Sequence, residues 1–70
     1  MNIGKSIKYG LVMKDMRAKD LAERLGVSQN YISLLSNGNK TPSARILTSL
    51  ALVFGMPVSE FIALGEEKAA

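Results

Sequence analysis

The sequence contains no cysteine and no histidine. Without cysteine the protein can form no disulfide and offers no thiolate to a metal, and without histidine it lacks the commonest neutral metal ligand and general base. The acidic residues and lysines that remain are scattered, and none falls into a paired or caged arrangement. The sequence therefore predicts that the protein is not an enzyme, holds no metal and needs no cofactor.

Long hydrophobic runs are also missing. The longest one, Leu50 to Met56, contains Gly55 and stops at Pro57, which is far short of the roughly 20 apolar residues that span a bilayer. A signal peptide needs an uninterrupted apolar core of about 7 to 15 residues, and lysines interrupt the amino-terminal segment at positions 5, 8 and 14. We therefore expect a cytoplasmic protein without a membrane partner.

What is present suits a small helical domain. With 70 residues the chain is long enough for one domain, and a domain of this size buries only about 60% of its unfolded surface. Hydrophobic residues make up 47% of the sequence and can supply a core, while two Pro and six Gly are too few for a disordered tract. Because so small a chain has no room for an active-site cleft between domains, a binding module is the first interpretation.

The charge is unevenly distributed along the chain. The net charge is +3, but residues 1–45 contain eight Lys and Arg against three acidic residues, whereas residues 46–70 contain one lysine against three glutamates. A basic amino-terminal half beside a mildly acidic carboxy-terminal one would suit a polyanion-binding face opposite an assembly face. Ordinary solvated charge explains the same distribution equally well.

Apolar residues at helical spacing predict five short helices, three of them in the first half of the chain. The first runs from about residue 3 to residue 14 and carries one apolar stripe. The second covers residues 18–25 and ends at Gly26. Ser28 is a good N-cap for the third, which runs from Gln29 to about Ser36.

The rest of the chain predicts two further helices and a tail. Pro42-Ser43 opens the fourth helix, whose apolar residues cover more than half of its circumference, and Gly55 stops it. Pro57-Val58 begins a short fifth helix, after which the remaining residues are typical of a frayed end. The sequence thus predicts one domain over residues 1–64 and a short flexible tail over residues 65–70.

Small and apolar residues recur at fixed places across the second and third predicted helices: Leu21-Ala22, Leu25-Gly26-Val27, Ile32 and Leu35. A small residue at position 22 lets the two helices cross closely, and the glycine at position 26 allows the positive φ that a turn of about three residues needs. Val27, Ile32 and Leu35 would fill the angle between the helices. This arrangement is typical of a helix-turn-helix.

The pattern resembles the helix-turn-helix of the phage-repressor and Cro family. The resemblance extends over nearly the whole chain, through Asn37-Gly38, Pro42-Ser43, Leu50-Ala51, Phe54-Gly55 and Glu60-Phe61-Ile62. It implies an all-α, lambda-repressor-like domain of five helices with the helix-turn-helix at its centre. Domains of this family bind operator DNA as dimers and act as repressors or regulators.

The resemblance also implies which residues read DNA bases. In a helix-turn-helix the second helix of the motif enters the major groove by its amino-terminal end. The expected base-contacting residues are Ser28, Gln29, Asn30, Ser33 and Leu34. Gln and Asn side chains can both bond adenine N6 and N7, whereas Ser discriminates weakly. Leu34 either meets a thymine methyl group or lies at the edge of the core.

Phosphate contacts are expected from residues that flank the same helix: Arg17, Lys19, Tyr31, Asn37, Lys40 and Arg45. Such contacts fix the register on DNA without reading its sequence. Relatives often carry Thr-Gln where this chain has Arg17-Ala18, so Arg17 would replace the usual Gln contact with charge, although it leaves the second helix without a Ser or Thr cap. Tyr31 either reaches a phosphate with its hydroxyl or packs on the first helix.

Together these features predict a sequence-specific transcriptional regulator that binds double-stranded DNA. By resemblance it is a Cro-like repressor or a restriction-modification controller, acting as a homodimer on a two-fold operator. Ile62 and Leu64 would form the dimer interface, unless they complete the core of the monomer. Because no second domain is visible, we expect no small-molecule ligand. The alternative is an antitoxin-type protein-interaction module, in which the fourth helix or the tail grips a toxin and DNA binding is secondary.

Overall fold

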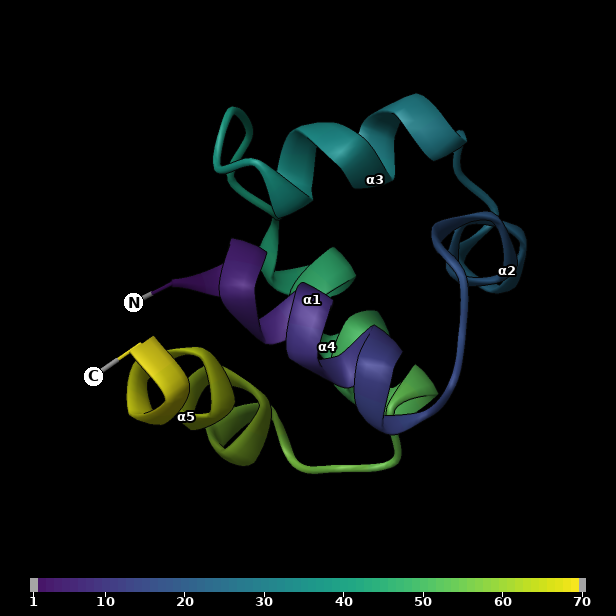
Figure 1. Cartoon of the computed structure of the whole chain (residues 1–70). Helices are drawn as coiled ribbons and strands as arrows, with labels where there is room; N and C mark the ends of the chain where they lie inside the picture. Colours follow the sequence, from purple (N-terminus) through teal and green to yellow (C-terminus); the bar gives the residue numbers. More distant parts are fainter. Residues whose placement is uncertain (1, 70) are drawn as a thin grey trace.

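The computed structural model describes residues 2–69, with their side chains as far as Glu66, and within that range the chain forms five α-helices and no strand. The helices are α1 (Ile3–Met13), α2 (Ala18–Leu25), α3 (Gln29–Ser36), α4 (Ala44–Val53) and α5 (Val58–Ala69). Figure 1 shows α3 across the top of the molecule and α2 at its right, α1 and α4 in the middle, and α5 beside α1 at the lower left, near both chain ends. The predicted all-α, five-helix fold class is confirmed.

Side-chain oxygens near the helix starts satisfy backbone N–H groups that have no partner inside a helix. Asn2, Ser28 and Ser43 each accept the backbone N–H three residues further on, at 3.1, 3.1 and 3.2 Å. The start of α2 has no such residue. Instead, the Arg17 backbone N–H donates to the Asp20 carboxylate at 3.2 Å, so the carboxylate reaches backwards and closes this end of the helix.

The helix ends are closed by residues in the left-handed region. At the end of α2, Gly26 has φ of +72°, as the short turn before α3 requires. The end of α1 has the same geometry without a glycine, because Asp15 adopts φ of +50° and the Met16 N–H donates to the Leu11 carbonyl oxygen at 2.8 Å. Asp tolerates this region better than most residues, but it is still less stable there than glycine.

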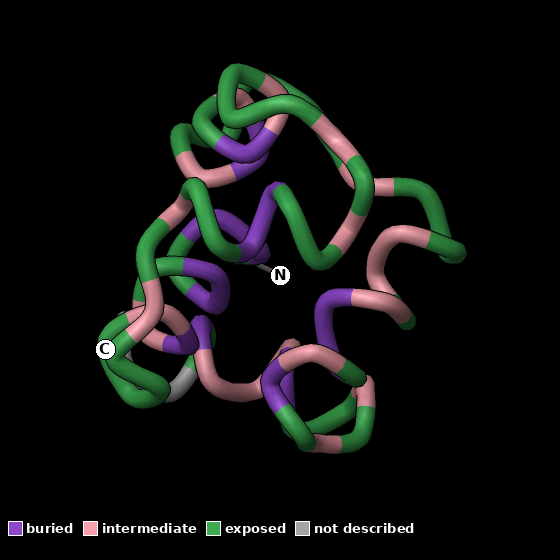
Figure 2. Tube along the Cα trace, turned by 90° about the vertical axis from the view of Figure 1, so that its right-hand side faces the viewer, coloured by how far each residue is buried: buried purple, intermediate pink, exposed green. Residues whose placement is uncertain are grey.

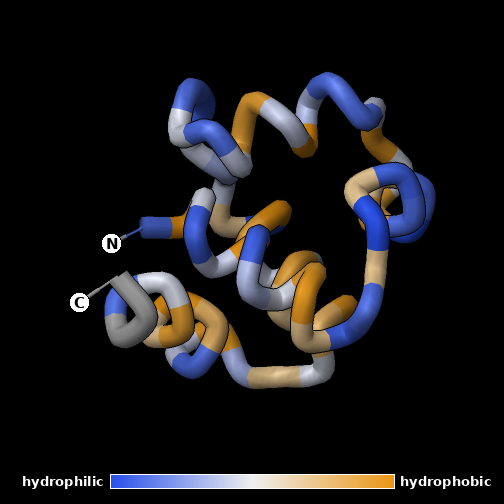
Figure 3. The backbone as a smooth tube through the Cα atoms, viewed as in Figure 1, coloured by the Kyte–Doolittle hydropathy of each residue, from blue (hydrophilic) through white to orange (hydrophobic). Residues whose placement is uncertain are grey.

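The core is formed by apolar side chains from all five helices: Ile3, Ile7, Leu21, Ala22, Ile32, Leu35, Leu50, Ala51, Phe54 and Phe61. The last two rings stack with their centroids 5.6 Å apart. α1 approaches this ring pair closely, since a Cβ on Gly10 would lie 2.9 Å from the Phe54 ring. In Figures 2 and 3 the buried and hydrophobic segments face the interior, and exposed, hydrophilic ones lie outside.

α1 and α5 are joined through their backbones. The buried Ser6 hydroxyl accepts the Gly65 N–H at 3.0 Å, and the carbonyl oxygens of Asn2 and Ile62 lie 3.3 and 3.5 Å from the same oxygen. A Cβ on Gly65 would collide with the Asn2 carbonyl and with Ser6. The contact therefore combines a hydrogen-bonding side chain on α1, Ser6, with a residue on α5 that has no side chain, Gly65.

This contact corrects the prediction for the carboxy-terminal end. The predicted end of the fifth helix before Gly65 is wrong, because α5 continues to Ala69 and Gly65 is buried within it. The domain boundary after Leu64 and the flexibility of residues 65–70 stay predictions, and residue 70 lies outside the described part. A glycine is a helix stop signal when judged by its neighbours alone. Here the glycine lies within the helix, and α1 leaves no space for a side chain at this position.

No single helix within residues 2–69 is long and apolar enough to cross a membrane. The helices Ala44–Val53 and Val58–Glu66 reach the necessary length and hydrophobicity only when they are taken together, and the chain bends by 87° between them.

Candidate nucleic-acid interface

The helix-turn-helix is formed by α2, the turn at residues 26–28, and α3. Leu21 and Ala22 of α2 and Ile32 and Leu35 of α3 are buried. Val27 precedes the cap of α3 and packs, like Ile32, in the core cluster, which sets the angle at which the chain enters the helix. The predicted roles of these residues in packing α2 against α3 are confirmed.

The outer face of α3 is polar at its amino-terminal end. Gln29, Asn30 and Ser33 are exposed, and so is Ser28. The Ser28 oxygen accepts the Tyr31 N–H, but its hydroxyl hydrogen can still be donated outwards. Leu34 is half-buried, so part of its side chain remains available one turn after Asn30 on the helix surface.

Exposed polar and cationic side chains flank this face on neighbouring segments. Arg17 and Lys19 lie at the start of α2, Asn37 follows α3, and Lys40 and Arg45 come from the loop before α4 and its first turn. All five are exposed. Figure 3 shows the hydrophilic colouring of the outer part of α2 and of the loop after α3.

Tyr31, the sixth residue expected to contact phosphate, is placed differently. It is half-buried and packs against the core cluster. This placement is closer to the packing alternative than to a side chain that extends freely towards a phosphate. Its ring also lies beneath a lysine, since Lys40 Nζ is 5.5 Å from the ring centroid. The sequence did not indicate this contact, because the two residues are separated by the end of α3 and a loop.

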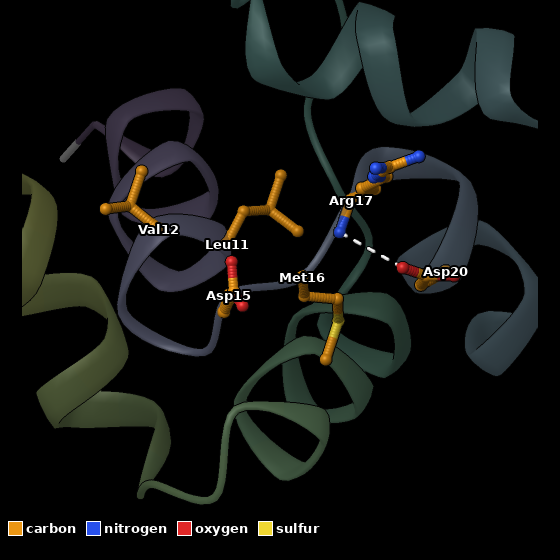
Figure 4. Close-up of a pocket in the computed structure, with 6 residues that line it drawn as sticks. All are labelled: Leu11, Val12, Asp15, Met16, Arg17 and Asp20. Carbon is orange, nitrogen blue, oxygen red and sulfur yellow. Dashed lines mark hydrogen bonds between the residues drawn. The ribbon is translucent and has the colours of Figure 1, made fainter.

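A hollow of about 490 Å³ lies beside the start of α2, lined by Leu11, Val12, Asp15, Met16, Arg17 and Asp20. Figure 4 shows the Arg17 guanidinium directed away from Leu11 and Met16, while its backbone N–H faces Asp20. Asp20 thus orients the backbone of a residue expected to meet phosphate. The signal in the sequence was an acidic residue three positions after the cap.

The described residues do not provide a metal centre. No group of three or more acidic side chains, in the part of the chain that the structure describes, could hold a metal ion. The exposed face of α3 offers amide and hydroxyl groups with cations around them, which suits recognition of a polyanion.

The two predicted interface residues of α5 lie in different surroundings. Ile62 is half-buried and packs against the core cluster. Leu64 is also half-buried, but it lines a hollow of about 340 Å³ together with Met13, Met56, Glu60 and Ala63. Met13 is 58% exposed, and neither methionine was predicted, because they come from α1 and from the turn before α5.

A packed α2–turn–α3 unit with exposed amides on its second helix and cations around it defines a helix-turn-helix domain of the DNA-binding class. A family model described as Helix-turn-helix matches residues 7–61. The chain belongs to the phage-repressor and Cro type helix-turn-helix family, whose members are DNA-binding regulators rather than enzymes.

Individual proteins agree with this assignment. The chain is 30% identical over 54 residues to an uncharacterized HTH-type transcriptional regulator of Methanocaldococcus jannaschii, a match that covers 77% of this chain and 82% of that protein. It is similar in structure to the clp gene regulator ClgR from C. glutamicum, with a TM-score of 0.87 and 26% identity, over 99% of this chain and 90% of that chain.

Proposed function

We propose that the protein binds a specific sequence of double-stranded DNA as a homodimer on a two-fold operator, and that it acts in the cytoplasm as a Cro-like repressor or a restriction-modification controller. The observation that carries the proposal is the exposure of Gln29 and Asn30 in the first turn of α3. Both side chains combine a donor and an acceptor that match an adenine edge. Exposed cations on α2 and before α4 supply the phosphate contacts that hold this helix in register.

The proposed base contacts are Ser28, Gln29, Asn30, Ser33 and Leu34, and the proposed phosphate contacts are Arg17, Lys19, Asn37, Lys40 and Arg45, with Tyr31 beside them. A binding-site selection on random duplex DNA tests this assignment. We expect enrichment of a palindrome whose half-sites lie about 34 Å apart, one turn of DNA. Recovery of no preferred sequence would contradict sequence-specific binding.

The homodimer is supported by the hollow beside α5. Met13, Met56 and Leu64 line it, and covering apolar surface stabilises an assembly by about 25 cal/mol per Å². The domain measures 29 × 24 × 21 Å, so two copies that meet at one edge can present two α3 helices about one DNA turn apart. We place Leu64 at the centre of this contact and Ile62 at its edge.

Sedimentation of the parent protein and of Leu64→Lys tests the dimer. We expect the variant to be monomeric, and Leu52→Lys to remain dimeric as the control, because Leu52 is 78% exposed and belongs to α4. A parent protein that is monomeric both alone and on its selected DNA would contradict the dimer.

A further inference from the structure

Lys40 belongs to the loop after α3, but its charge lies beside the helix rather than beyond its end. The Lys40 Nζ is 5.5 Å from the centroid of the Tyr31 ring, within the roughly 6 Å over which an aromatic face attracts a cation. Tyr31 is in the first turn of α3. The loop therefore carries a positive charge back towards the end of the helix where Gln29 and Asn30 are exposed.

The two partners are held very differently. Tyr31 is half-buried, packs against the core cluster and donates its backbone N–H to the Ser28 cap. Lys40 is exposed, and a free lysine stem has about 2 kcal/mol of rotamer entropy. The backbone of the loop is fixed just before it, because the Asn39 N–H donates to the Leu34 carbonyl oxygen at 2.9 Å. A rigid ring thus faces a flexible side chain that starts from a fixed backbone.

We propose that Tyr31 is a positioning residue for Lys40. Its ring holds the ammonium group beside α3, so that Lys40 meets one DNA phosphate next to the bases read by Gln29 and Asn30. The aromatic face, and not the hydroxyl, performs this role. The inference rests on the proposed function, because it requires α3 to lie in the major groove. The ring would position Lys40 for its phosphate contact already in the free protein, before DNA binds.

The first experiment needs no DNA. In the nuclear magnetic resonance spectrum of the free protein, the ε-methylene protons of Lys40 should resonate upfield of those of Lys19, because they lie over a ring. Lys19 is the matched control, since it is an exposed lysine on α2. Tyr31→Phe should preserve the upfield shift and Tyr31→Leu should abolish it. Equal shifts for the two lysines in the parent protein would overturn the proposal.

The second experiment measures affinity for a short random-sequence duplex at several salt concentrations. Lys40→Met should reduce the salt dependence by about one counterion. Tyr31→Leu should weaken binding by about 2- to 5-fold in the parent protein, but by nothing in the Lys40→Met background. In the Lys19→Met background the loss from Tyr31→Leu should be undiminished, and Tyr31→Phe should lose less affinity than Tyr31→Leu.

Several results would contradict the proposal. Additive losses from Tyr31→Leu and Lys40→Met would show that the ring acts independently of the lysine. A loss in Tyr31→Phe as large as in Tyr31→Leu would assign the contact to the hydroxyl. Thermal melts check that each variant is folded. Tyr31→Leu keeps an apolar side chain against the core cluster, so we expect it to stay folded. A parent protein that binds no duplex would overturn the proposed function as well, whereas intact binding without the upfield shift overturns only the role of Tyr31.

Discussion

The outer face of α3 and the contact between α1 and α5 are built in opposite ways. On α3 the side chains of Gln29, Asn30 and Ser33 extend into solvent from a helix whose other face is buried. Where Ser6 of α1 meets Gly65 of α5, the glycine has no side chain to separate the helices, and the Ser6 hydroxyl accepts the Gly65 N–H directly. The first region leaves polar groups exposed to solvent, and the second brings two backbones together.

This difference separates binding from stability within a very small domain. An exposed amide on α3 makes few contacts inside the protein, so we expect that replacing it changes binding with little effect on folding. A side chain added between α1 and α5 meets a backbone carbonyl, so we expect it to change folding and to leave the proposed DNA-binding face intact.

The largest effect is expected from Gly65→Ala. Helix propensity alone would favour alanine by about 1 kcal/mol, but the new Cβ would collide with the Asn2 carbonyl and Ser6. We expect a net loss of about 1 to 3 kcal/mol in the free energy of unfolding, measured by chemical denaturation. Ser59→Ala, at an exposed position of the same helix, is the control and should change stability little. An unchanged or raised stability in Gly65→Ala would show that α1 can yield.

The complementary effect is expected from Gln29→Ala and Asn30→Ala. Each should weaken binding to the selected operator by about 1 to 3 kcal/mol and binding to random duplex only slightly, while the melting temperature stays close to that of the parent. Lys8→Ala, an exposed residue on α1, should leave the ratio of the two affinities unchanged. If Gln29→Ala also left that ratio unchanged, α3 would not be the helix that reads the bases.

A smaller effect is expected from Asp20→Ala. The Asp20 carboxylate caps the start of α2, where it accepts the Arg17 N–H at 3.2 Å. Its loss should lower the free energy of unfolding by about 1 kcal/mol. Glu23→Ala removes an exposed carboxylate further along the same helix and should cost less. Equal losses in the two variants would indicate a general effect of charge instead of a cap.

The smallest effect, and an increase, is expected from Asp15→Gly. Asp15 has φ of +50°, where a residue with a side chain is disfavoured by about 1 to 2 kcal/mol. Glycine avoids this cost, but it loses more conformational entropy on folding, which offsets part of the gain in stability. We expect a gain of about 0.5 kcal/mol in chemical denaturation. Asp15→Ala removes the same carboxylate but keeps a Cβ, so it should destabilise. A loss of stability in both variants would assign the role of Asp15 to its carboxylate.

The α2–turn–α3 unit could be predicted from the sequence almost completely. The predicted bounds of residues 18–25 and 29–36 match those of α2 and α3, since a cap at Ser28 and a glycine at position 26 act on their immediate neighbours. The exposure of Gln29 and Asn30 followed from the same periodicity. Their contacts with DNA remain predictions.

The rest of the candidate site depends on residues far apart in the chain. Met13 and Met56 meet Leu64 only because the turn before α5 returns the chain to the end of α1, and the Lys40 charge lies over Tyr31 only because the loop folds back along α3. A methionine or a lysine is not unusual at any of these positions when its neighbours in sequence are considered. The hydrophobic pattern therefore carried no signal for these contacts.

Local patterns were sufficient to specify an all-α helix-turn-helix domain, because caps, glycine turns and the spacing of apolar residues act within a few positions of one another. Local patterns did not predict where α5 ends. Gly65 looks like a stop when its neighbours alone are considered, and it is part of a helix because Asn2 and Ser6, nearly the whole chain away, occupy the place of its missing side chain. Space between packed backbones is a property of the folded molecule, and so only the assembled helices could determine where the last one ends.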